Sequence, residues 1–563
     1  MTQNTKTGVG RREILTGAAA LAASGVALSI PAQAAGISGN AASRKAILTV
    51  SDSSAVAETT AGKVRGANRN GIFTFKGIPY AGDTGGEARF LPPTKAKAWT
   101  GVRSSLTYGR VCPQSPRAGW DRDENAFMFE WDDGQPGEDC LRVNIWTPGL
   151  KDNRKRPVLF WIHGGGFTAG SGQELKSYDG ENLSRRGDAV VVSINHRLNV
   201  LGYLNLAAYG QRYAESANVG MLDIVASLEW VRDNVANFGG DPGNVMIFGQ
   251  SGGGAKVSAL MAMPAAKGLF HKAAVLSGSN VRAITAEYAA EVAAGVLAEL
   301  EVSGPDQLTG VPYARLLAAA TSPQRRITPP RPCGLRIAGI RDSFGFGATV
   351  DGKVLPHHPF DPAAPAISAN VPLLIGHCSN EFTNGISRPD WFSMSDQEME
   401  TQVAADYGTK SAAIIAAYRG VHPHAKACDL VSYISTGAVR YQAVVQAGRK
   451  AAQNAGSAYL YQFHWQTPVL DGRPGAFHCA DLPFVFDNTD RCAAMTGGTP
   501  EARELGARIS EAFLQFARKG NPNHKDLPFW PVYQPGNGAT MFFDNRCEVK
   551  NDPDRQARET LIA

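Results

Sequence analysis

The sequence has no long run of basic residues, and its formal net charge is only +5 over 563 residues. Proteins that bind nucleic acid through its phosphates need lysine and arginine clustered on one surface. The lack of such a cluster argues against nucleic acid as a partner. Internal repeats and long Pro-rich or Gly/Ser-rich linkers are also missing. One large domain therefore fits better than several smaller ones.

Cysteine pairs with metal-binding spacing are absent as well. No two cysteines form a CxxC pair, and no group of histidine and cysteine has the spacing of a zinc site. We therefore expect no metal. Cysteines in this number suit an oxidising compartment, where disulfides persist, but the number does not determine their pairing. The cysteines are Cys112, Cys140, Cys333, Cys378, Cys428, Cys479, Cys492 and Cys547.

A targeting segment is predicted at the N-terminus. Arg11 and Arg12 precede an apolar run over residues 14–30, and an A-x-A-like cleavage site follows. This pattern predicts a twin-arginine signal peptide over residues 1–34, and export of residues 35–563 to the periplasm or beyond. A membrane anchor is the alternative, but the run is short for a span of about 20 apolar residues and is interrupted by glycine and serine. We therefore expect no stable membrane anchor.

Short apolar runs that suit strands buried on both faces alternate with helical patterns. One helix is predicted over residues 223–238, where a glycine pair ends it. The alternation predicts an α/β fold with a large, mostly parallel sheet and helices on both faces. Around residues 285–365 the pattern loosens, and we expect a mainly helical insertion over one end of the sheet. The strand-like runs are residues 158–162, 189–194, 245–248, 371–375 and 458–463.

The strongest chemical signal is a Gly-x-Ser-x-Gly sequence with Ser251 at its centre. It lies between the predicted strand over residues 245–248 and a helical run over residues 255–263. In that position the sequence is typical of a nucleophile elbow, a tight turn that exposes the serine hydroxyl. The N-terminus of the helix also favours developing negative charge. A phosphate-binding loop is the alternative, but the lysine of that motif is absent.

A second glycine-rich loop agrees with this interpretation. His163, three glycines and Phe167 directly follow the predicted strand over residues 158–162. An esterase places its oxyanion loop at this point, because glycines let backbone NH groups approach the tetrahedral oxyanion. One such donor contributes roughly 3 to 4 kcal/mol to transition-state stabilisation. We interpret His163 as a residue that orients the loop, because the chain order expected of this fold places the base after the serine.

The chain order serine, acid, histidine leaves five candidate bases. His478 lies in a loop after a strand, whereas His464 lies within an alternating strand pattern and His524 lies in a turn, so we prefer His478. For the acid, the predicted strand over residues 371–375 leads into a loop that carries one carboxylate, Glu381. The candidate bases are His422, His424, His464, His478 and His524.

Ordered motifs over residues 62–553 resemble those of the type-B carboxylesterases, the family that also contains the cholinesterases. The resemblance implies the α/β-hydrolase fold, with Ser251, Glu381 and His478 as the catalytic triad. So many motifs in the right order make chance agreement implausible. The motifs are residues 75–80, 89–90, 138–141 with Asn144, 163–167, 218–220, 238–242, 249–253, 269–270 and 277–278.

The same resemblance implies two further features of the site. The NH groups of Gly165, Gly166 and Gly252 are expected to form the oxyanion hole. A disulfide between Cys112 and Cys140 is expected to close a loop beside the active site. The aromatic residues of that loop could line a substrate pocket or serve ordinary packing; they are Trp120, Phe127, Phe129 and Trp131.

Two positions depart from the family pattern. Members commonly have glutamate before the nucleophile and alanine after it, where this chain has Gln250 and Gly252. Gly252 keeps its NH donor, so we expect no effect on the mechanism. Gln250 removes a negative charge beside the serine, which predicts neutral rather than cationic ester substrates.

Together these residues predict a serine carboxylesterase that acts on a small-molecule ester and needs no cofactor. The base takes the proton of Ser251, the serine attacks the ester carbonyl, and water releases the acyl-enzyme. A lipase, or an amide or carbamate hydrolase, is an alternative, because fold and triad do not set the leaving group. A non-catalytic binding protein on the same fold is a further alternative, disfavoured because the triad is intact.

Overall fold

Parallel strands form the centre of a twelve-stranded sheet in the computed structural model, which describes residues 46–115, 122–327 and 346–563. From β9 to β16 neighbouring strands are parallel, whereas the pairs toward both edges are antiparallel. The predicted α/β class is confirmed. In order across the sheet the strands are β1 (Leu48–Thr49), β4 (Ala67–Arg69), β5 (Ile72–Pro79), β7 (Arg142–Thr147), β9 (Val190–Ile194), β8 (Arg156–Ile162), β10 (Gly240–Gln250), β11 (Lys272–Leu276), β14 (Leu373–Cys378), β15 (Ala458–Phe463), β16 (Ala539–Phe543) and β17 (Glu548–Asn551).

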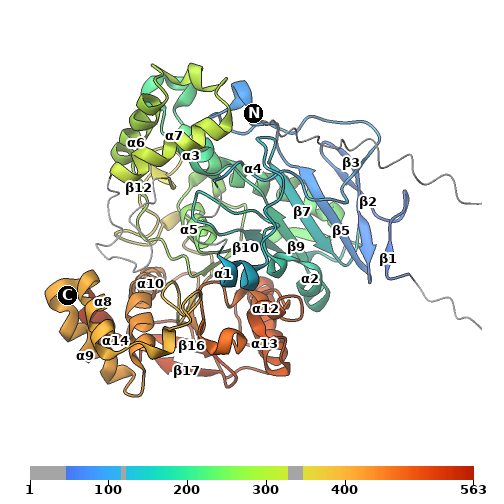
Figure 1. Cartoon of the computed structure of the whole chain (residues 1–563). Helices are drawn as coiled ribbons and strands as arrows, with labels where there is room; N and C mark the ends of the chain where they lie inside the picture. Colours follow the sequence, from blue (N-terminus) through green and yellow to red (C-terminus); the bar gives the residue numbers. More distant parts are fainter. Residues whose placement is uncertain (1–45, 116–121, 328–345) are drawn as a thin grey trace, which may run out of the picture. The chain divides into compact units, whose positions relative to one another are not determined.

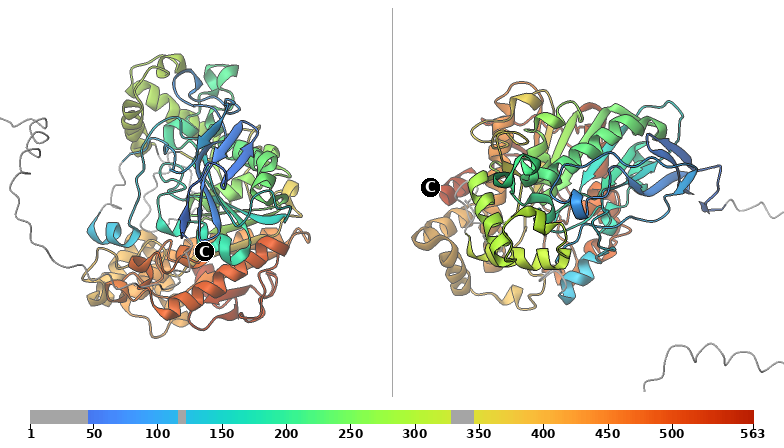
Figure 2. Two further views of the ribbon diagram at one scale, coloured as in Figure 1. Left: turned by 90° about the vertical axis from the view of Figure 1, so that its right-hand side faces the viewer. Right: turned by 90° about the horizontal axis from the view of Figure 1, so that it is seen from above.

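The central strands are apolar on both sides because helices cover both faces of the sheet (Figure 1, Figure 2). Successive side chains of a strand point to opposite faces. In β8, Val158 and Phe160 therefore belong to one buried cluster, together with residues of α4, α5 and α10. Leu159 and Trp161 belong to the other, together with residues of α2 and α13. These helices are α2 (Glu181–Gly187), α4 (Val219–Asn234), α5 (Gly252–Leu260), α10 (Ala427–Ala451) and α13 (Pro500–Lys519).

The segment expected to be a helical insertion contains α6 (Ala286–Glu299) and α7 (Tyr313–Arg326), which pack side by side (Figure 1). It also contributes β13 (Thr349–Val350), which pairs with β12 (Ile284–Thr285). A second helical region, α8 (Asp396–Tyr407) and α9 (Ser411–Val421), precedes α10 and was not singled out from the sequence.

Smaller elements complete the described part of the chain. A separate three-stranded sheet contains β2 (Val56–Thr59), β3 (Gly62–Arg65) and β6 (Val102–Ser104). The remaining α-helices are α1 (Asp123–Phe129), α3 (Asn199–Tyr203), α11 (Leu482–Val485), α12 (Ala493–Thr496) and α14 (Arg555–Ile562).

Element boundaries shift where tertiary pairing extends a local pattern. The predicted strand over residues 245–248 lies in the second half of β10. The strand begins earlier, at Gly240, because Gly240 pairs with Arg156 of β8; the register shifts between Gly240 and Val245. The predicted helix over residues 223–238 begins earlier, as α4, and ends in a short 3-10 turn, Val235–Phe238.

The predicted signal peptide over residues 1–34 lies outside the described residues. Residues 47–563 group into one compact unit. Within the described ranges, no helix combines the length and the apolar character needed to cross a bilayer.

Candidate active site

Ser251 occupies the sharp turn between β10 and α5. Its backbone lies at φ 55° and ψ −125°, a conformation that a residue with a side chain adopts only at a cost of about 1 to 3 kcal/mol. The NH of Ser251 donates to the carbonyl of Leu276 at 2.8 Å, and the NH of Ala255 donates to the carbonyl of Ser251 at 3.1 Å. Strand pairing and the first helical turn therefore hold the strained residue in place, as a nucleophile elbow requires.

The glycine loop after β8 packs directly on this turn. Gly165 and Gly166 have positive φ values of 79° and 63°. A Cβ atom added to Gly252 would lie only 2.1 Å from the carbonyl oxygen of Gly166. The absence of a side chain at Gly252 is therefore what lets the loop approach the elbow so closely, and an alanine here would force the two apart.

Glu381 and His478 meet at the C-terminal ends of two neighbouring strands. Glu381 lies in the loop after β14, and His478 lies in the loop after β15. A short contact joins the Nδ1 atom of His478 to the Oε2 atom of Glu381, and the NH of His478 donates to the Glu381 carbonyl at 2.9 Å. The other carboxylate oxygen, Oε1, accepts from the NH of Cys378 at 2.9 Å. Both carboxylate oxygens are thus engaged, and one of them orients the imidazole.

Backbone hydrogen bonds fasten these two loops together. The NH of Asn380 donates to the carbonyl of Ala476 at 3.0 Å, and the NH of Ala476 donates to Oδ1 of Asn380 at 3.1 Å. The hydroxyl of Thr436, on α10, accepts from the NH of Glu381 at 3.1 Å. The carboxylate and the imidazole therefore sit on a rigid frame rather than on free loops.

Burial raises the pKa of the Glu381 carboxyl, but interactions with His478, His377 and Ser277 together lower it by more, so the net direction is downward. Glu381 is therefore ionised when the pair is assembled. A second buried carboxyl, Asp481, lies three residues after His478. Burial raises the pKa of Asp481 to about 6, although a hydrogen bond from Tyr461 at 2.8 Å opposes the rise.

Gln250 contacts the imidazole of His478. Its side chain is 1% exposed, and its amide Nε2 lies 3.0 Å from Nε2 of His478. Because the amide nitrogen can only donate, the imidazole nitrogen accepts, which requires a neutral ring with its proton on Nδ1 facing Glu381. Within the described residues no hydrogen bond joins Ser251 to His478.

The other candidate bases lie elsewhere. His464 is half-buried and stacks on Phe542, and loss of solvent around its ring lowers its pKa to about 3. His422 stacks on Tyr433 at the end of α9, and His524 contacts the carbonyl of Arg508. In the described part of the chain, none of these three side chains hydrogen-bonds to Ser251 or Glu381.

His163 belongs to the glycine loop, as its position in the sequence indicated. It is fully buried, its Nδ1 lies 3.0 Å from the carbonyl of Gly164, and its ring stacks on His196 with centroids 4.8 Å apart. These contacts suit a residue that shapes the loop.

The aromatic residues of the predicted pocket differ in their surroundings. Phe129 is buried, stacks on Trp131 at 4.8 Å and meets Phe477, the neighbour of His478, edge to face at 5.8 Å. Phe127 is 53% exposed on α1, so it does not form part of a buried wall. Trp120 lies outside the described residues.

Two residues that sequence reasoning missed also lie at the site. The ring of Phe382 lies on the imidazole of His478, with centroids 4.1 Å apart. Lys256, on α5, is fully buried and donates to the carbonyl of Gly166 at 2.6 Å. A lone cation in an otherwise apolar helical run was the available signal for Lys256.

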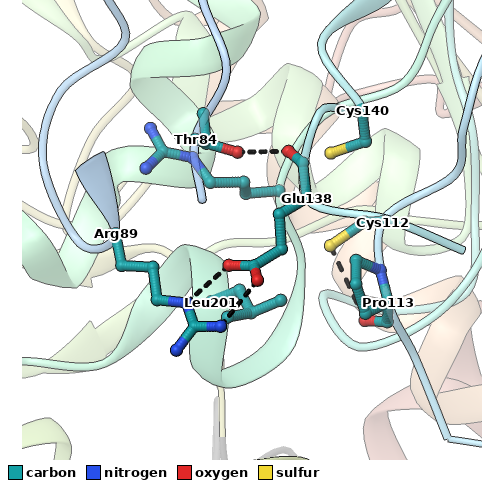
Figure 3. A pocket seen from close by; sticks show the side chains of 8 residues that line it. Thr84, Arg89, Cys112, Pro113, Glu138, Cys140 and Leu201 are labelled. Atoms are coloured by element: carbon teal, nitrogen blue, oxygen red, sulfur yellow. Dashed lines mark hydrogen bonds and ion pairs between the residues drawn. The ribbon is translucent and has the colours of Figure 1, made fainter. Parts of the chain in front are cut away.

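Cys112 and Cys140 lie side by side as free thiols, with their sulfur atoms facing each other (Figure 3). Both are buried, and the NH of Leu198 donates to the Cys112 sulfur at 3.2 Å. A small hollow beside them is lined by the ion pair of Arg89 and Glu138, whose two hydrogen bonds are each 2.6 Å. The disulfide implied by the resemblance stays a prediction.

In an oxidising compartment we expect Cys112 and Cys140 to be bridged. Closing the loop between residues 112 and 140 should stabilise the fold by about 3.5 kcal/mol in the chain-entropy model. Cys112→Ser with Cys140→Ser should therefore lower the free energy of unfolding by that amount, measured by denaturant titration of oxidised protein. Cys428→Ser, which removes another buried thiol, is the matched control and should have a much smaller effect. Non-reducing peptide mapping that finds both thiols free would refute the bridge.

Comparisons with known proteins agree with this geometry. The sequence model described as the Carboxylesterase family matches residues 53–560. The para-nitrobenzyl esterase of Bacillus subtilis (strain 168) is 34% identical, over 90% of this chain and 98% of that protein. The phenmedipham hydrolase of Pseudarthrobacter oxydans is 31% identical, over 90% of this chain and 99% of that protein.

Solved structures show the same relationship. An esterase from Clostridium hathewayi that can hydrolyse aliphatic aromatic polyesters has a TM-score of 0.76 at 35% identity, covering 91% of this chain and 99% of its own. The Geobacillus stearothermophilus carboxylesterase has a TM-score of 0.73 at 35% identity, covering 90% of this chain and 100% of its own. The predicted fold and enzyme class are confirmed. The chain therefore belongs to the carboxylesterase family and is a serine carboxylic-ester hydrolase with the α/β-hydrolase fold.

Proposed function

We propose that Ser251 is the nucleophile, His478 the base and Glu381 the residue that orients the base. The observation that carries the proposal is the strained elbow at Ser251, whose preceding residue, Gln250, already contacts the imidazole of the Glu381–His478 pair. Strain at one residue persists only where the surrounding structure holds it, and it is common at active sites.

The reaction follows from these positions. Nε2 of His478 takes the hydroxyl proton while Oγ of Ser251 forms a bond to the ester carbonyl carbon. The NH groups of Gly165, Gly166 and Gly252 receive the oxyanion. The imidazolium gives its proton to the leaving alcohol as the C–O bond breaks, and an acyl-enzyme remains. Water then repeats the sequence and releases the carboxylic acid.

Gln250 has a specific part in this cycle. Nε2 of His478 has one lone pair, so the Gln250 amide and the Ser251 hydroxyl compete for it. In the free enzyme the amide nitrogen occupies this position, 3.0 Å from Nε2 of His478. The amide must yield this position for the serine proton to transfer, consistent with catalytic hydrogen bonds that tighten only when substrate is bound.

The substrates that this site favours are neutral esters. A quaternary ammonium group is bound by aromatic faces, worth roughly 0.5 to 2 kcal/mol, and by nearby negative charge. Gln250 supplies no charge, and Glu381 already faces His478. A hydrolysis panel of esters varying in acyl length, alcohol and charge, run beside an amide and a carbamate, tests the substrate class. Preferred cleavage of the amide or carbamate over every ester would overturn it.

Within that panel, we expect a choline ester to have a lower kcat/KM than its isostere in which carbon replaces the quaternary nitrogen. Gln250→Glu should reduce the difference in kcat/KM between the two esters, because it adds a negative charge that favours the cationic one. A carboxylate beside Nε2 also favours the protonated imidazole. The rise of kcat/KM with pH should therefore move to higher pH in this variant.

Gln250→Met is the matched control, because it has similar size without charge or hydrogen-bonding nitrogen. It should leave the ratio between the two esters unchanged. A wild-type enzyme that prefers the cationic ester by tenfold, about 1.4 kcal/mol, would contradict the idea.

We also propose that the chain is exported and loses residues 1–34. The arginine pair, the apolar run over residues 14–30 and the A-x-A-like site that follows it support this proposal. The peptide mapping described above also gives the first residue of the exported protein, which we expect near Ala35.

A further inference from the structure

Lys256 is a charged side chain in a place where charge is costly. It lies on α5, the helix that begins directly after Ser251, and its exposed fraction is 0%. An ammonium group removed from water destabilises a fold unless hydrogen bonds compensate. The proposed reaction steps use no lysine. Its burial beside the nucleophile therefore calls for another role.

The contacts of Lys256 are concentrated on one loop. Its Nζ atom donates to the carbonyl of Gly166 at 2.6 Å and approaches the carbonyl of His163 at 3.5 Å. The same atom lies 4.9 Å from the ring centroid of Phe167, within the range of a cation–π interaction. These three partners belong to the glycine loop that supplies the proposed oxyanion donors.

The carbonyl of Gly166 is held from two directions. Lys256 draws it toward α5, and the missing side chain of Gly252 leaves room for it, since a Cβ there would lie 2.1 Å from the same oxygen. The donors of the proposed oxyanion hole come from the glycine loop and from Gly252. The distance between the donors on the glycine loop and the donor at Gly252 therefore depends on where the Gly166 carbonyl is held, which is the group that Lys256 contacts.

We infer that Lys256 is a positioning residue of the oxyanion hole, whose ammonium ties the glycine loop to the helix of the nucleophile and adds positive charge next to the developing oxyanion. The inference rests on the proposed function, which assigns NH groups of the loop and of Gly252 to that hole. Preorganised donors act mainly on the transition state, so the effect falls on kcat rather than on KM.

The charge of Lys256 depends on pH. Burial lowers its pKa to about 7, and the charge of Glu174 opposes the shift. Two histidines are the other titratable groups near Lys256. Burial and the charge of Lys256 lower the pKa of His196 well below the usual range, and the ring of His163 stacks on His196. Raising the pH through this range removes the ammonium charge. We therefore expect kcat/KM for a neutral ester to fall again on the alkaline side.

Three variants separate the possible roles. Lys256→Met removes charge and donor, and Lys256→Gln keeps an NH donor without charge. Lys450→Met is the matched control: Lys450 is also buried, donates to the carbonyls of Ser368 and Ala369 at 3.1 and 2.6 Å, and has a pKa lowered by burial to about 8. It lies at the end of α10, away from the glycine loop.

For each variant we would measure kcat, KM, the pH profile with a neutral ester, and the affinity for a trifluoromethyl ketone. Addition of the Ser251 hydroxyl to this ketone forms an oxyanion without turnover, so its affinity reports on the hole directly. In Lys256→Met we expect kcat to fall by roughly 10- to 100-fold with KM within threefold. The ketone affinity should fall in parallel, and the alkaline fall should disappear. Lys256→Gln should recover part of kcat without the alkaline fall, and Lys450→Met should match the wild type.

Wild-type kcat, ketone affinity and pH profile in Lys256→Met would overturn the inference, as would an equal loss in Lys450→Met or a change in KM alone. If Lys256→Met does not fold, Lys256→Gln decides: retention of the wild-type alkaline fall in that variant overturns the inference. A wild-type protein that is inactive on every ester and does not bind the ketone contradicts the proposed function instead.

Discussion

Replacing Ser251 by alanine is expected to lower kcat for a neutral ester by roughly 10⁴ to 10⁶, because members of a triad act as one unit. The fold should remain intact. Alanine at this position bears the same backbone strain at φ 55°, and the hydrogen bond from its NH to Leu276 does not involve the side chain. The measurement is steady-state turnover, with thermal unfolding as the check on folding.

An organophosphate supplies an independent readout of the same assignment. Intact mass should show one adduct on the wild-type protein, peptide mapping should place it on Ser251, and Ser251→Ala should take up none. Ser258→Ala is the matched control, because Ser258 lies further along α5 and its hydroxyl donates to the carbonyl of Gly254 at 3.0 Å. It should keep the adduct and most of the activity. Near-normal turnover in Ser251→Ala would show that another group is the nucleophile.

The second large effect is expected at the base. A neutral imidazole must accept the serine proton, so kcat/KM should rise with pH on the acid side of the profile. His478→Ala should lower kcat by roughly 10⁴ or more and abolish this rise. The measurement is kcat/KM from pH 5 to pH 9 with an ester that has no titratable group.

His464→Ala is the control that distinguishes the candidate histidines. Loss of solvent around the ring disfavours the charged imidazole and lowers the pKa of His464 to about 3, so this group is already neutral throughout the range of the assay. It therefore cannot produce a rise within that range, and its replacement should leave the profile in place. Loss of the rise in His464→Ala, with activity retained in His478→Ala, would reassign the base.

Local sequence patterns predicted those parts of the site that are formed by residues contiguous in the chain. Strand, turn and helix around Ser251 follow from an apolar run, a glycine-rich turn and a helical run that are contiguous in the chain, and the structure has that turn with the strained φ of 55°. The loop at His163 was predicted on the same grounds. The predicted strand over residues 458–463 matches β15 (Ala458–Phe463).

Boundaries and surfaces depend on partners that lie far along the chain. β10 extends back to Gly240 because that residue pairs with Arg156 of β8. Phe127 and Phe129 are the same residue type and both lie on α1. Phe127 is 53% exposed, whereas Phe129 is 3% exposed because it packs against Phe477. Composition is the same for both, so only the packing decides which is buried.

By itself, the sequence determined the fold class, the elbow at Ser251 and a preferred acid and base, because each rests on a short contiguous pattern or on motifs in order. Only the tertiary structure decided what these groups touch. Glu381 and His478 are 97 residues apart and meet through paired loops, and Gln250 reaches His478 across 228 residues. Lys256 donates to a carbonyl 90 residues earlier in the chain. Such contacts arise when distant segments pack together, and a hydrogen bond between them leaves no periodicity in the sequence from which it could be predicted.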